Sequence, residues 1–61
     1  MFKVSLINSQ RCNFDNAQFE DLEMAKEWAN DRKGIYNVYI IETDEDNEIV
    51  DEMEYKISNI K

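Results

Sequence analysis

The segment from Ile35 to Thr43 constrains the fold of this chain more than any other, because it is rich in β-branched and aromatic residues. In a strand, one face would carry Tyr36, Val38 and Ile40, and the other would carry Ile35, Tyr39 and Ile41. A strand that is apolar on both faces must lie in the centre of a sheet or meet a partner. The sequence therefore predicts a central strand or an interaction surface here.

The N-terminal part predicts one strand clearly and a second strand less directly. Phe2 to Asn8 alternates apolar and polar side chains, which is typical of a half-buried strand, and the polar segment 8–11 predicts a turn. Residues 12–19 then form a second strand with an irregularity at Asp15-Asn16, or they are a loop that leads directly into a helix. The two alternatives give the element orders ββαββ and βαββ.

A helix is predicted after Glu20. Asp21 can cap its start, and Gly34 follows as a stop. One arc of this helix would be apolar, with Leu22, Met24, Ala25, Trp28 and Ala29. On this arc Trp28 is interpreted as a core residue.

The C-terminal part predicts a closing hairpin. Residues 44–48 form a polar turn, and the following residues alternate again. We therefore predict a single domain over residues 1–61. It is an α+β fold, a small antiparallel meander sheet of three or four strands with one helix packed on one face. The second face of such a sheet is uncovered and would present an apolar and aromatic patch.

Residues with catalytic or metal-binding chemistry are scarce in the 61-residue sequence. Cys12 is the single cysteine, and the absence of histidine removes the commonest metal ligand and general base. Asp44, Asp46 and Glu48 follow the start of a calcium loop, but Ile49 stands where the loop requires glycine. We therefore expect no enzymatic activity, no cofactor and no metal site.

Acidic residues are concentrated in the C-terminal third of the chain. Between Glu42 and Glu54 there are eight carboxylates and no basic residue, whereas residues 1–41 hold six acidic and five basic residues. The net charge of −7 argues against direct binding to nucleic acid or to an anionic membrane, because both are polyanions. The chain has no apolar run that could span a membrane and no secretory signal pattern, so we expect a cytoplasmic protein.

The acidic hairpin suggests binding to the basic surface of another protein. In a sharper form of this hypothesis the chain is an inhibitor, as in phage counter-defence or host takeover, that occupies a nucleic-acid-binding site as a DNA mimic. Paired strands can present one charge per ~3.3 Å, and DNA presents one per ~1.7 Å. The predicted contact residues are Glu42, Asp44, Glu45, Asp46, Glu48, Glu52 and Glu54, with Tyr36 or Tyr39 as an apolar anchor.

A second hypothesis assigns the protein to a different class. The chain would be a homodimeric structural or assembly module, in which the exposed strand face pairs with its own copy. The acidic residues would then serve only solubility, which is the commoner role of a run of like charges.

Overall fold

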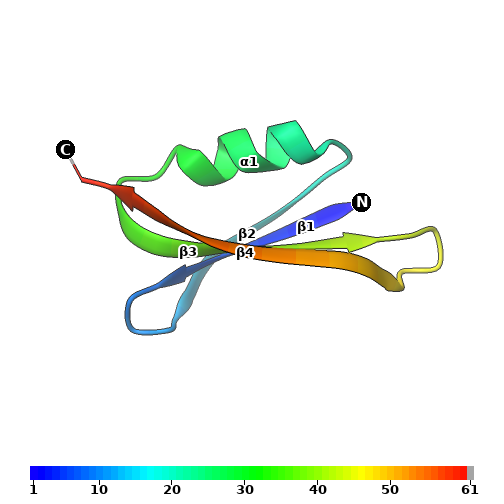
Figure 1. Ribbon diagram of the computed structural model, residues 1–61, viewed down its shortest axis with the longest axis horizontal. Coiled ribbons are helices and arrows are strands. Elements are labelled where there is room, and N and C mark those ends of the chain that lie inside the picture. Colours follow the sequence, from blue (N-terminus) through cyan, green and yellow to red (C-terminus); the bar gives the residue numbers. More distant parts are fainter. Residues whose placement is uncertain (61) are drawn as a thin grey trace.

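The computed structural model describes residues 1–60, which form one antiparallel sheet with a helix above one face (Figure 1). In chain order the elements are β1 (Phe2–Asn8), β2 (Asn13–Phe19), α1 (Leu22–Asn30), β3 (Gly34–Thr43) and β4 (Ile49–Asn59). The predicted α+β fold with the order ββαββ is confirmed, and residues 13–19 are a strand.

The strand order in space is β2-β1-β3-β4, and all neighbours are antiparallel. The predicted central position of β3 is confirmed, since it lies between β1 and β4. The connection from β2 through α1 places β3 on the far side of β1, so β1 lies between β2 and β3. In a strict meander β3 would pair with β2 instead. Strands β2 and β4 are therefore the two edges of the sheet.

The start of the helix is capped as predicted, and its end differs from the prediction. The carboxylate of Asp21 accepts a hydrogen bond from the backbone N–H of Glu23, at 3.0 Å. The helix already ends at Asn30. Gly34, with a φ of 116°, opens β3 instead of capping the helix, because the left-handed conformation turns the chain back toward the sheet.

The core lies between α1 and the two central strands. Its buried members are Val4, Leu6, Ala25, Ala29, Tyr36, Val38 and Ile40. The helix therefore covers the face of β3 that carries Tyr36, and it leaves the face with Ile35 and Tyr39 uncovered. Trp28 packs against the core as predicted, and the centroid of its ring lies 5.8 Å from that of Phe19.

Two bulges interrupt the ladders. The register between β1 and β2 shifts so that Phe14 has no partner in β1, one residue before the predicted irregularity. The register between β3 and β4 shifts beside Glu42, so that Val50 is the extra residue. Both bulges lie near turns, and β4 stays in regular register with β3 from Asp51 to Asn59.

Candidate protein-binding surface

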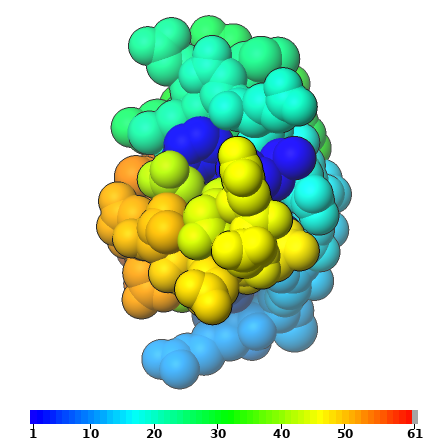
Figure 2. Space-filling model, turned by 90° about the vertical axis from the view of Figure 1, so that its right-hand side faces the viewer, coloured from blue at the N-terminus to red at the C-terminus, as the bar shows by residue number. Residues whose placement is uncertain are grey.

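The turn between β3 and β4 forms one end of the molecule, seen on the right in Figure 1 and facing the viewer in yellow in Figure 2. The carboxylate of Asp44 closes this turn by accepting hydrogen bonds from the backbone N–H groups of Asp46 and Glu48, at 2.9 and 3.0 Å. Asn47 has a φ of 64°, a conformation that asparagine tolerates better than most residues. Asp44 thus orders the turn, and Glu45, Asp46 and Glu48 remain exposed on it.

The predicted acidic residues of the two strands lie on opposite faces of the sheet. Glu52 and Glu54 are exposed on the uncovered face. Glu42 lies on the face covered by the helix, directly opposite Asp51. It borders a cavity of about 80 Å³ that Leu22 of the helix also lines.

This division changes the expected charge density. On the uncovered face, the residues of β3 opposite Glu52 and Glu54 are Ile41 and Tyr39, which carry no charge at neutral pH. One strand alone therefore supplies the carboxylates, at about 6.6 Å intervals, or about a quarter of the density of duplex DNA. The expectation of one charge per ~3.3 Å was wrong for this face, because the side chains that β3 presents to it, Tyr39 and Ile41, carry no charge. The dense acidic cluster is the turn.

Of the two predicted tyrosine anchors, one is buried and the other is accessible. Tyr36 is only 3% exposed and lies under the helix, so its side chain is part of the core. Tyr39 lies on the uncovered face, and its hydroxyl donates a hydrogen bond to the Glu52 carboxylate, at 2.9 Å. This bond, together with desolvation and the charges of Glu52 and Glu54, raises the pKa of Tyr39 above 10.0. Tyr39 is therefore held beside the acidic residues of β4.

The uncovered face combines apolar and charged side chains. Its apolar residues are Ile7, Ile35, Tyr39 and Ile41. Lys3 lies beside Ile41 across the β1–β3 ladder, and Ile41 lies beside Glu52 across the next one. An apolar centre with charged residues around it is the composition found at protein–protein contacts.

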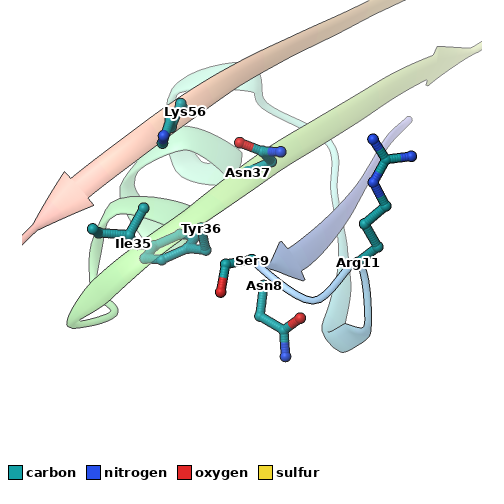
Figure 3. A pocket seen from close by; sticks show the side chains of 7 residues that line it. All are labelled: Asn8, Ser9, Arg11, Ile35, Tyr36, Asn37 and Lys56. Carbon is teal, nitrogen blue, oxygen red and sulfur yellow. The ribbon is translucent and has the colours of Figure 1, made fainter.

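A basic end lies opposite the acidic turn, and the sequence analysis missed it. A depression of about 230 Å³ is bordered by Arg11 from the β1–β2 turn, Asn37 from β3 and Lys56 from β4, whose side chains Figure 3 shows. Within residues 1–60, neither Arg11 nor Lys56 forms an ion pair. These two residues are far apart in the sequence, and strand pairing brings them to the same depression. The sheet is therefore acidic at one end and basic at the other.

An ion pair lies at the β2 edge of the sheet. Arg32, just after the helix, donates a hydrogen bond to the Asp15 carboxylate of β2, at 2.8 Å. The bond lowers the pKa of Asp15 below 3.8. The guanidinium also lies over the Trp28 ring, 4.7 Å from its centroid. Arg32 thus links the helix to the edge strand β2 and takes no part in the acidic surface.

The described residues were also searched for metal and membrane sites. Among residues 1–60, no three side chains of the types His, Cys, Asp and Glu are arranged to hold a metal ion. No helix in the same part of the chain has the length and hydropathy needed to cross a membrane. Cys12 is a free, exposed thiol.

Comparison with known proteins adds no relative. No protein-family model matches the chain, and no curated protein or solved structure is significantly similar to it.

Proposed function

We propose that this chain is a small non-enzymatic interaction protein that binds a basic surface of another protein through its acidic turn and the neighbouring part of β4. The observation that carries this proposal is the ordered turn, in which Asp44 holds the backbone while three further carboxylates remain exposed. Charges fixed on a rigid turn lose little conformational freedom on binding.

The partner class that fits best is a protein that binds nucleic acid in the cytoplasm. Its basic groove would accept the turn in place of phosphates, and the chain would act as an inhibitor of the type used in phage counter-defence or host takeover. Tyr39 and Ile41, next to the carboxylates of β4, would supply apolar contact area. The turn would imitate a local cluster of phosphates and not a length of duplex, since the sheet face lacks the charge density of duplex DNA.

The experiment is an affinity capture from bacterial lysate at low salt with two neutralised variants. The turn variant carries Glu45→Gln, Asp46→Asn and Glu48→Gln, and it keeps Asp44 so that the turn stays closed. The control variant carries Glu20→Gln, Glu23→Gln and Glu27→Gln, which removes the same charge from the segment around the helix.

We expect the wild type and the control variant to retain the same nucleic-acid-binding protein, and the turn variant to lose it. Duplex DNA should release the captured protein, and the complex should weaken steeply with salt. Equal capture by the turn variant would refute the proposal. Equal loss from the control variant would refute it as well, since bulk charge would then suffice.

A further inference from the structure

The strand β4 is a long edge whose outer side has no partner within residues 1–60. In Figure 1 it is a long strand that runs from the acidic turn to the C-terminal end. It extends over 11 residues, and the part from Asp51 to Asn59 runs without a bulge. An edge strand exposes a row of unpaired backbone N–H and C=O groups, which is a template for another strand.

Proteins commonly protect such edges with proline, with a bulge or with inward-pointing charges. The opposite edge, β2, has only 7 residues and a bulge at Phe14. The regular part of β4 has no proline. On the helix side it carries Asp51 and Asn59 at its two ends, and the three side chains between them, Met53, Tyr55 and Ile57, pack against the core. These three are only partly buried, so their edge-facing sides can still be covered.

The charges of β4 form a pattern that is complementary to itself. Glu54 and Lys56 flank Tyr55 on the uncovered face. If two copies of β4 pair in antiparallel register about Tyr55, Glu54 of each copy lies opposite Lys56 of the other. In the same register Met53 lies opposite Ile57, so apolar side chains meet on the helix side. Opposite charges and apolar pairs across strands both stabilise a ladder.

The neighbouring registers are less favourable. A register centred on Glu54 or on Lys56 places that residue opposite its own copy. A register centred on Met53 places Glu52 opposite Glu54 twice. Like charges directly opposite each other destabilise a ladder, and a shift by one residue changes the face of every side chain. Of these four registers, only the one about Tyr55 avoids a like-charge pair.

We propose that two copies of this chain associate through their β4 edges, in antiparallel register about Tyr55. The two sheets then form one continuous sheet, with both helices on the same face. The two acidic turns point to opposite ends, which limits the repulsion between chains of charge −7. Both turns and both uncovered faces remain free, so this inference does not depend on the proposed function.

The test is a charge exchange measured by sedimentation equilibrium. Glu54→Lys alone gives each edge a lysine at both paired positions, 54 and 56, and Lys56→Glu alone gives it a glutamate at both. We expect each single variant to self-associate at least roughly tenfold more weakly than the wild type, and an equimolar mixture of the two to restore the dimer. As a matched control, Lys26→Glu and Glu27→Lys change the same charges on the helix and should leave self-association unchanged.

A wild type that stays monomeric at millimolar concentration would refute the proposal, and so would single variants that dimerise as well as the wild type. Hydrogen exchange of the wild type provides a readout without substitutions. The β4 amides that point away from β3 should become protected as concentration rises. Added salt should strengthen self-association by screening net repulsion, whereas it should weaken the complex with a basic partner. Failure of one proposal is therefore distinguishable from failure of the other.

Discussion

The substitution Tyr36→Phe tests how the helix is attached to the sheet. The Tyr36 hydroxyl is buried and donates to two backbone carbonyl oxygens. One is that of Ala29, in the last turn of α1, and the other is that of Arg32, just after the helix. These carbonyls have no partner in the helix itself, since the last turn of a helix leaves its C=O groups free. Phenylalanine keeps the ring, which packs edge-on against Phe14 with centroids 5.8 Å apart, and removes only the donor.

The magnitude follows from which carbonyl loses its donor. In the variant the Arg32 carbonyl still accepts a hydrogen bond from the Asn59 side chain, at 2.9 Å, so only the Ala29 carbonyl is left without a donor. Leaving one buried acceptor unsatisfied costs about 1–3 kcal/mol. A 61-residue domain has a free energy of unfolding of about 3–9 kcal/mol in total. Each kcal/mol shifts the melting temperature of a small domain by about 4–8 °C.

The assay is thermal and urea unfolding followed by far-ultraviolet circular dichroism. We expect Tyr36→Phe to lower both the melting temperature and the urea midpoint, with an unchanged dependence on urea. Tyr39→Phe is the matched control, because its hydroxyl bonds to an exposed carboxylate, and its melting temperature and urea midpoint should change far less than those of Tyr36→Phe. If the two variants were equally stable, the hydroxyl of Tyr36 would not be holding the helix, and our account of its attachment would be wrong.

Two further predictions concern the acidic hairpin. Asp44→Ala should lower the melting temperature, by a loss on the order of 1 kcal/mol, because two backbone N–H groups lose their acceptor, whereas Asp46→Ala should raise it by relieving repulsion; a rise for both would show that Asp44 does not order the turn. Because the pKa of Tyr39 is raised in the fold, its contribution to stability is present below pH 10.0 and is lost as the pH rises through the raised value. In a spectrophotometric titration, Glu52→Gln should move the Tyr39 pKa back toward 10.0 while the raised pKa of Tyr55, which is due mainly to burial, stays in place; an unchanged Tyr39 titration would contradict the hydrogen bond.

Local patterns in the sequence were sufficient to predict the helix and three of the four strands, whereas residues 12–19 could be read as a strand or as a loop. A period of two defines the strands, and a period near 3.6 between Asp21 and Gly34 defines the helix. The segment Ile35 to Thr43 was recognisable as a central strand or an interaction surface because both of its faces are apolar. These inferences depend only on which side chains alternate along the chain.

The arrangement of the candidate surface required the tertiary structure. Carboxylates that are close in sequence, such as Glu42 and Glu52, lie on opposite faces, because the register of β3 against β4 is set by a bulge at Val50. Arg11 and Lys56, 45 positions apart, border one depression only because β1, β3 and β4 are neighbours.

The sequence by itself determined the strands other than β2, the helix, the single small core and the acidic character of the last hairpin, because each depends on local periodicity and composition. The tertiary structure decided which face of β3 the helix covers, that Tyr36 is buried while Tyr39 is accessible, and that β4 is a free edge. The physical reason is that pairing and helix docking are contacts between distant segments. In this chain both faces of β3 are apolar enough to have been the buried one, so only the packing of the whole domain selects between them.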